Sequence, residues 1–118
     1  GHGVGYFLNV HEGPHGISKY NKVKLKEGMI LSNEPGYYET NKFGIRIENL
    51  IYIKKEKNKT YFENLTMVPI DKDLINKNLL NKSEKKWLNN YHMGVFNLLK
   101  NSMNKFEILE LKKACSAI

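Results

Sequence analysis

Asn33-Glu34-Pro35-Gly36 opens the stretch that decides the fold, and Phe43-Gly44-Ile45-Arg46-Ile47-Glu48-Asn49 closes it. Each motif places a glutamate, Glu34 or Glu48, in a segment with strand character. Upstream, a histidine, His2, lies between two glycines. Two carboxylates and one imidazole are a suitable ligand set for a hydrolytic metal centre. Three side chains are too few to hold two ions, so the sequence predicts part of such a centre.

The chain divides into a strand-rich part, residues 1–70, and a helical part, residues 71–118, which we interpret as two parts of one domain. Gly, aromatic and β-branched residues gather in the first part, and helical periodicity begins after it. The sequence therefore predicts an α+β fold in which an antiparallel sheet is followed by helices. The expected strands are 4–10, 29–34 and 43–54, with a hairpin that pairs 50–54 with 61–70.

Alternation along the 43–54 strand puts Ile45 and Ile47 on one face and Arg46 and Glu48 on the other. The isoleucines are expected to anchor this strand in the core. The guanidinium could hold acidic ligands in place and offset their repulsion. An edge-strand ion pair between Arg46 and Glu48 is the alternative reading. In the same way Glu34 could be a polar strand end and His2 a loop histidine, because no single one of these signals is specific.

Capping residues mark the helices of the second part. Asp71 is expected to begin a short helical turn, and Asn81 or Ser83 a longer helix that runs to about residue 100. We expect His92 on the solvated, polar side of this helix and a last helix near 105–114. One apolar stripe follows the longer helix: Trp87, Leu88, Tyr91, Val95, Leu98 and Leu99.

The composition of the chain argues against two classes of partner, nucleic acids and membranes. The net charge of +7 comes almost entirely from lysines that form no block, and Arg46 is the only arginine, which argues against a nucleic-acid partner. The sequence has no apolar run of about 18 residues or more, so no membrane partner is expected. The only cysteine, Cys115, cannot form an internal disulfide, which fits a reducing, cytoplasmic location.

The motifs together resemble the catalytic domain of aminopeptidase P, the Xaa-Pro aminopeptidase of the pita-bread metallopeptidases, particularly its cytosolic eukaryotic branch. Methionine aminopeptidases and prolidases share the glycine-flanked histidine and the two glutamates. The sequence of residues 9–14 combined with that of residues 33–38 is more similar to aminopeptidase P. The resemblance covers residues 1 to about 100 and implies the C-terminal half of a pita-bread domain, with a curved antiparallel sheet followed by helices. The segments that carry it are 1–5, 7–14, 33–39, 43–49, 65–70 and 87–92.

Roles follow from this resemblance position by position. It implies that His2, Glu34 and Glu48 are metal ligands, with Glu48 bridging two ions and Glu34 serving as general base. His11 matches a histidine that contacts substrate and stabilises the tetrahedral intermediate, and Arg46 matches an arginine that supports the ligands. The cofactor would be two divalent ions, Mn2+ first, with Zn2+ or Co2+ as replacements. The reaction would remove the N-terminal residue of a peptide that has proline at its second position.

The resemblance also implies ligands that this sequence lacks. Two aspartates and a further histidine are expected upstream of Gly1, so we expect the chain to be the C-terminal half of a catalytic domain. The N-terminal half would be its partner, and the chain alone would be inactive. The helix with Trp87 is a candidate for a homodimer contact. A non-catalytic pita-bread module that binds peptide or protein is the alternative function.

Overall fold

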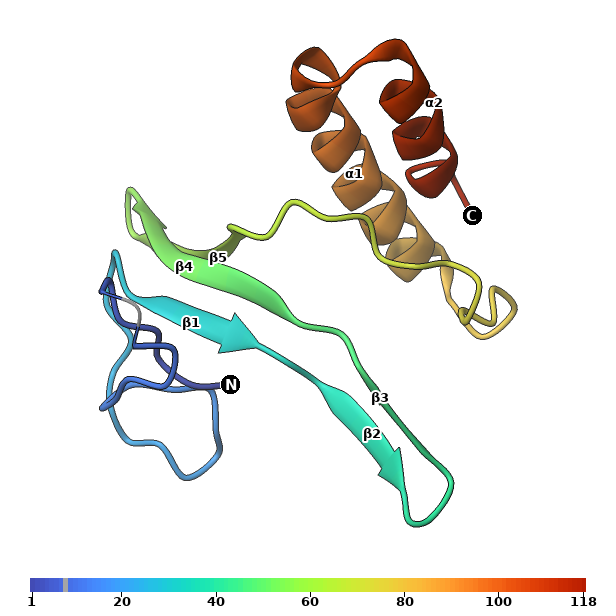
Figure 1. Ribbon diagram of the computed structural model, residues 1–118. Helices are drawn as coiled ribbons and strands as arrows, with labels where there is room; N and C mark the ends of the chain where they lie inside the picture. The colour runs from blue at the N-terminus through green and yellow to red at the C-terminus, as the bar shows by residue number, and fades with distance from the viewer. Residues whose placement is uncertain (8) are drawn as a thin grey trace. The chain divides into compact units, whose positions relative to one another are not determined.

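The structure, a computed structural model, describes residues 1–7 and 9–118 (Figure 1). The chain forms two compact units, Gly1–Thr66 and Met67–Ile118. All five strands of the described residues belong to the first unit, and the helices belong to the second. Strands followed by helices agree with the α+β class expected from the sequence.

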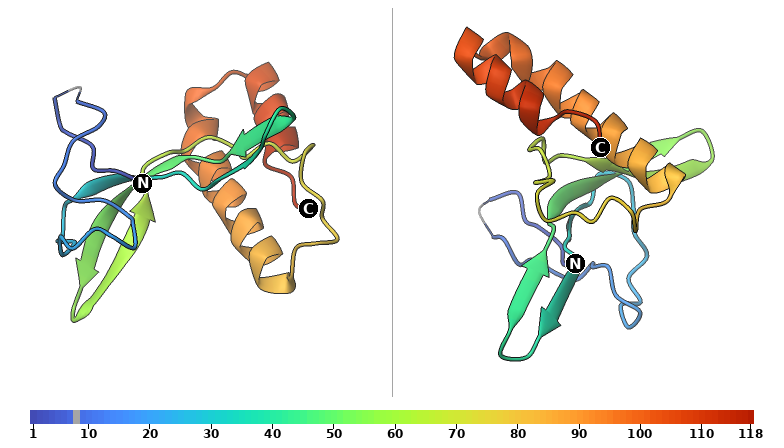
Figure 2. Two further views of the ribbon diagram at one scale, coloured as in Figure 1. Left: turned by 90° about the horizontal axis from the view of Figure 1, so that it is seen from below. Right: turned by 90° about the vertical axis from the view of Figure 1, so that its right-hand side faces the viewer.

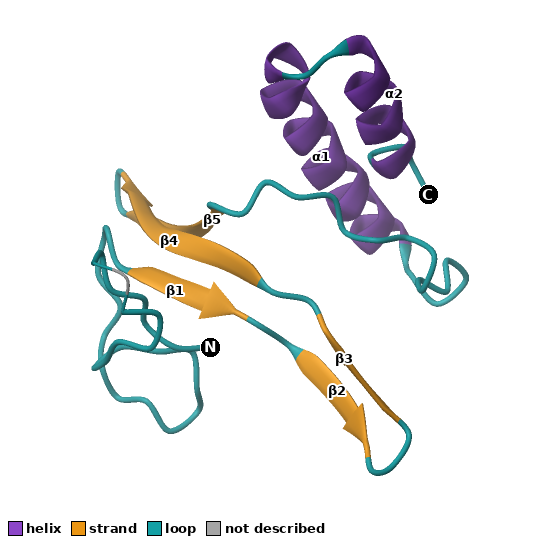
Figure 3. Ribbon diagram, viewed as in Figure 1, coloured by secondary structure: helices purple, strands orange, loops and turns teal. Residues whose placement is uncertain are grey.

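Two antiparallel ladders build the first unit (Figure 3). The larger sheet has the strand order β1-β4-β5, and the smaller sheet pairs β2 with β3. β1 is followed by β2, and β3 is followed by β4. The same two stretches of chain therefore pair first as β1 with β4 and then, beyond a break, as β2 with β3. The strands are β1 (Ile30–Asn33), β2 (Gly36–Glu39), β3 (Phe43–Arg46), β4 (Asn49–Glu56) and β5 (Lys59–Asn64).

The hairpin between β4 and β5 is confirmed, although its second strand ends at Asn64 instead of residue 70. The β2–β3 hairpin was not predicted, because Pro35-Gly36 was interpreted as the end of a strand. In each turn a non-glycine residue, Asn41 (φ 58°) or Lys57 (φ 55°), adopts the left-handed conformation. The predicted 43–54 strand is interrupted between Arg46 and Asn49.

Two further expectations for the first unit were wrong. The segment 4–10 forms no strand among its described residues; residue 8 lies outside them. Ile45 and Ile47, expected in the core, are 44% and 45% exposed. They lie on and next to a two-stranded ladder, which offers little surface to bury them. The core lies instead under the larger sheet, where Leu31, Ile51 and Ile53 pack with Leu25 and Met29.

The second unit contains α1 (Lys82–Leu99), a short 3-10 helix, η1 (Lys100–Ser102), and α2 (Lys105–Ala114). Both predicted helices are confirmed. Asn81 and Asn104 are the N-caps, and each makes a capping box with the glutamate three residues later. α1 and α2 run antiparallel (Figure 2). No helix in the part of the chain that the structure describes is long and apolar enough to cross a membrane.

His92 was expected in solvent but is completely buried. It shares the inner face of α1 with Leu88 and Val95, and its Nε2 accepts a hydrogen bond from the Ile70 N–H at 3.1 Å. The segment before α1 therefore covers a face that looked polar in sequence. Asp71 begins a turn in which the Asp73 N–H donates to its Oδ1, but no helix forms there.

Candidate metal centre

Backbone hydrogen bonds hold His2 at the edge of the larger sheet. Residues 2–4 run antiparallel beside β1, where the Ser32 N–H donates to the His2 carbonyl at 2.9 Å. Gly3 has to be glycine, because a Cβ there would lie 2.1 Å from the carbonyl oxygen of Glu12. The Nδ1–H of His2 donates to the Gly3 carbonyl at 2.9 Å. This bond fixes the tautomer and leaves the Nε2 lone pair available to a metal ion.

Glu34 and Glu48 meet where the two ladders join. Asn33 pairs with Asn49 in the larger sheet, and the β2–β3 ladder begins with Gly36 opposite Arg46 in the same register. Continuing this register through the break places Glu34 opposite Glu48. The ladder is interrupted because Pro35, between the two sheets, has no N–H to donate. Two like charges directly opposite one another are destabilising unless a cation lies between them.

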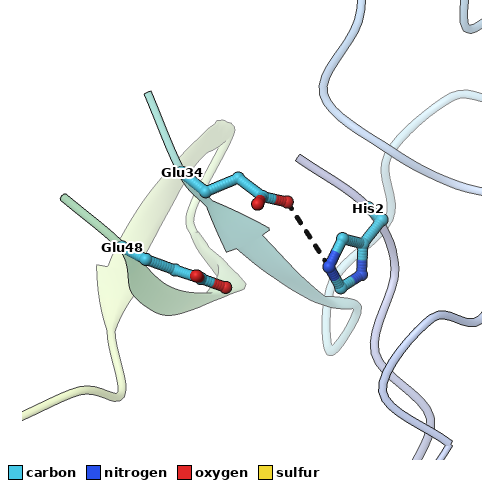
Figure 4. A group of neighbouring side chains, drawn as sticks. All are labelled: His2, Glu34 and Glu48. Carbon is cyan, nitrogen blue, oxygen red and sulfur yellow. Dashed lines mark ion pairs between the residues drawn. The ribbon is translucent and has the colours of Figure 1, made fainter. Parts of the chain in front are cut away.

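The three side chains converge on one small volume. Each offers one ligand atom, and these atoms lie within 4.8 Å of one another. The His2 Nε2 is 3.4 Å from the Glu34 Oε1. Figure 4 shows both carboxylates pointing to the side on which the His2 ring lies. The structure thus brings together residues from three separate segments, although their role as metal ligands stays a prediction.

Glu34 is held at both oxygens. The Ser32 hydroxyl donates to Oε1 at 2.9 Å, and the Arg46 Nη1 donates to Oε2 at 3.2 Å. The Arg46 Nε in turn donates to the Tyr38 hydroxyl at 2.8 Å. The hydrogen bond from Ser32 lowers the pKa of Glu34, and the positive charge of Arg46 acts in the same direction. The carboxylate is therefore kept in its ionised, ligating form.

The other histidines of this unit contact His2 or the strand beside it. The His11 ring is next to the His2 ring, with centroids 4.2 Å apart and planes inclined by 40°. His11 is exposed and offers no atom to the three-residue cluster. His15, for which the sequence suggested no role, donates from Nε2 to the Ile30 carbonyl at 3.0 Å. It ties its own loop, whose His15 carbonyl accepts from the Gly3 N–H, to β1.

Sequence reasoning missed Ser32 and Tyr38. A strand period of two puts Ser32 on the same face as Glu34, so their contact could have been inferred. Tyr38 could not be placed, because the strand that carries it was not predicted.

The three side chains are of the chemical types that bind a divalent ion, but they are too few to bind two ions. One imidazole nitrogen and carboxylate oxygens suit Mn2+ or Zn2+. Glu48 is exposed and Glu34 and His2 are partly buried, so an ion could reach all three side chains. Each of two ions needs about four or more ligands. His2, Glu34 and Glu48 can therefore supply only part of a dinuclear ligand set.

Two family models match the chain. One is described as metallopeptidase family M24 and matches residues 1–55. The other is described as the C-terminal region of peptidase M24 and matches residues 59–118. The three clustered residues all lie within the first match, and both helices lie within the second.

Relatives from several organisms match as well. A probable Xaa-Pro aminopeptidase P of Laccaria bicolor is 48% identical, and the match covers 100% of this chain and 20% of that protein. One of Tuber melanosporum is 53% identical over 81% of this chain and 17% of that protein. The chain thus spans about a fifth of the length of the curated relatives it matches.

A solved structure is similar across almost the whole chain. It is described as the X-prolyl aminopeptidase from Caenorhabditis elegans, "a cytosolic enzyme with a di-nuclear active site". The match has a TM-score of 0.85 at 39% identity and covers 99% of this chain and 21% of that one. This likeness confirms the expected pita-bread fold.

Proposed function

Since the chain belongs to the M24 family of metallopeptidases, we propose that it supplies His2, Glu34 and Glu48 to the dinuclear centre of an Xaa-Pro aminopeptidase. The observation that carries this proposal is the convergence of the three ligand atoms within 4.8 Å. Residues outside 1–118 would complete the ligand set, because three side chains cannot satisfy two ions. The nematode relative supports this assignment, because it is named an X-prolyl aminopeptidase and is described as having a di-nuclear active site.

Each residue at the site has a distinct task in this proposal. Bound divalent ions would supply Lewis acidity toward a peptide carbonyl and lower the pKa of water. Glu34, held at both oxygens, would accept a proton and pass it to the leaving amine. Glu48 would bridge the ions from the opposite strand, and Arg46 would keep Glu34 from turning away. His11, beside His2, would contact the substrate and stabilise the developing negative charge.

The substrate would be a peptide with proline at its second position, as the names of the relatives indicate. Manganese is the proposed ion, with zinc and cobalt as replacements, because carboxylate oxygens form most of the ligand set. A cytoplasmic location is proposed because the nematode enzyme is described as cytosolic. A homodimer contact through the helix with Trp87 stays a prediction. Retention of all three ligand residues disfavours a non-catalytic binding module.

A hybrid enzyme tests this proposal. Residues 1–118 of this chain replace the matching segment of the nematode X-prolyl aminopeptidase, which aligns with 99% of the chain. We expect the hybrid to bind about two Mn2+ ions and to cleave an Xaa-Pro peptide, whereas the 118-residue chain alone does not. Glu34→Gln and Glu48→Gln should each reduce activity by about a hundredfold to ten-thousandfold, the range over which a positioned proton-transfer group contributes.

The matched control is Glu27→Gln, which makes the same charge change at an exposed residue of the same unit. This variant should retain activity. A folded hybrid that binds metal but whose Glu34→Gln variant is as active as the unsubstituted hybrid would contradict the proposed roles.

A further inference from the structure

Ser32 is a buried polar residue that contacts two of the ligand residues. Its exposed fraction is 0%. The His2 N–H donates to its Oγ at 2.9 Å, and Oγ donates to the Glu34 Oε1 at 2.9 Å. The His2 carbonyl is a second acceptor at 3.4 Å. A hydroxyl has only one hydrogen, and the shorter, charge-assisted bond to the carboxylate is the stronger of the two.

These contacts form one path between segments 30 residues apart in sequence. The path starts at the backbone of His2, passes through the hydroxyl of Ser32, and ends at the Glu34 Oε1. That same oxygen lies 3.4 Å from the His2 Nε2. The hydroxyl therefore holds the Glu34 Oε1 directly and holds the backbone from which the His2 ring extends.

Loss of the hydroxyl would act on both ends of this path. The His2 N–H would lose its acceptor, which is costly for a partly buried donor. Glu34 would keep only its Oε2 bond to Arg46, at 3.2 Å, and would be free to turn Oε1 away from His2. A carboxylate oxygen that accepts one hydrogen bond still has a lone pair for an ion. The bond from Ser32 is therefore compatible with metal binding by the same oxygen.

We propose that Ser32 is a positioning residue that joins His2 to Glu34 and thereby sets the affinity of the centre for a divalent ion. The inference rests on the proposed function, because it assigns a role around those two ligands. Ser32 touches neither substrate nor ion; it acts through the residues that do.

The experiment compares three variants of the hybrid enzyme, prepared metal-free and titrated with Co2+. Ser32→Ala should weaken Co2+ binding about 10- to 100-fold, as the loss of a residue that orients a ligand typically does, and should shift the visible absorption of the bound ion. Ser32→Thr keeps the hydroxyl and should restore both affinity and spectrum. Ser18→Ala is the matched control, because it removes a hydroxyl of the same unit that accepts from the Tyr20 N–H at an exposed position.

Ser18→Ala should leave the Co2+ affinity and spectrum unchanged. If Ser32→Ala does not fold, Ser32→Cys fills similar space with a weaker donor and is judged in the same way. A Ser32 variant that lowers the unfolding temperature but binds Co2+ with the affinity and spectrum of the unsubstituted hybrid overturns the inference. Metal binding and peptide cleavage by the unsubstituted hybrid would still support the proposed function in that case.

Discussion

Tyr38 illustrates how a single exposed side chain can support the cluster of His2, Glu34 and Glu48. Its hydroxyl accepts a hydrogen bond from the Arg46 Nε, and Arg46 in turn holds Glu34. The Tyr38 ring lies against the bare backbone of Gly44, where a Cβ would come within 2.6 Å of its Cδ1. A glycine on the neighbouring strand thus gives the ring the place from which its hydroxyl reaches the guanidinium.

Replacement of Tyr38 by Phe removes the acceptor but keeps the ring beside the guanidinium, so that Glu34 is the hydrogen-bond partner left to Arg46. One hydrogen bond of this kind contributes roughly 0.7–1.4 kcal/mol, so the Mn2+ affinity of the hybrid enzyme should fall about threefold to tenfold. The titration is calorimetric. Tyr37→Phe is the control, since Tyr37 points to the opposite face of the same strand and should leave the affinity unchanged. Equal affinities for the two variants would show that the hydroxyl does not support Arg46.

Elements whose signals are local were predicted well, whereas those that depend on distant partners were not. α1 and α2 begin at asparagines that cap their own helices, so their bounds could be derived from adjacent residues. β2 was missed because Pro35 was interpreted as the end of a strand. A new strand begins directly after Pro35, and it forms only because it pairs with β3. The motifs indicated His2, Glu34 and Glu48 correctly as neighbours. Their register across Pro35 needed the structure.

His92 was misplaced for the same reason, because its partner belongs to an irregular segment. The Tyr91 hydroxyl donates to the Val68 carbonyl and the Ile70 N–H donates to His92, so residues 67–70 are held on α1. Burial lowers the pKa of His92, and the positive charge of Lys72 acts in the same direction. Neutral imidazole is therefore the form that the folded unit accepts.

This lowered pKa predicts how the helical unit responds to acid. Above about pH 6.5 His92 is neutral in both the folded and the unfolded chain, and its contribution to stability is complete. As the pH falls below that value, the unfolded chain takes up a proton more readily, so the free energy of unfolding decreases until the folded pKa is reached. Urea unfolding of the chain at pH 8, 6.5 and 5.5, followed by the fluorescence of the only tryptophan, Trp87, measures this decrease.

His92→Gln separates this effect from the other three histidines. Its amide oxygen can still accept from the Ile70 N–H but does not titrate in this range. The variant should lose part of the pH dependence between 8 and 5.5. An unchanged dependence would mean that another group is responsible.

At the scale of the whole molecule, the cluster of His2, Glu34 and Glu48 places two carboxylates that repel one another in the absence of a cation. Glu34 is compensated by Ser32 and Arg46, but Glu48 lies opposite it without a comparable contact among the described hydrogen bonds and ion pairs. Stability is thus reduced at the break between the two ladders, as is common where function requires like charges side by side. The sequence motifs indicate which residues are involved. The repulsion between Glu34 and Glu48 can be inferred only from the register that places them on opposite strands.

Glu48→Gln in the hybrid enzyme should therefore have opposite effects with and without metal. In chelator the variant should be more stable than the unsubstituted hybrid by about 0.5 kcal/mol, because a like-charge cross-strand pair is removed. With Mn2+ at a hundred times its dissociation constant, the unsubstituted hybrid gains roughly 2.7 kcal/mol by linkage, and the variant should gain far less. Glu27→Gln makes the same charge change away from the site and should behave as the unsubstituted hybrid in both conditions. Thermal unfolding of the three proteins decides the matter: if Glu48→Gln is no more stable in chelator than Glu27→Gln, the carboxylates do not repel across the break.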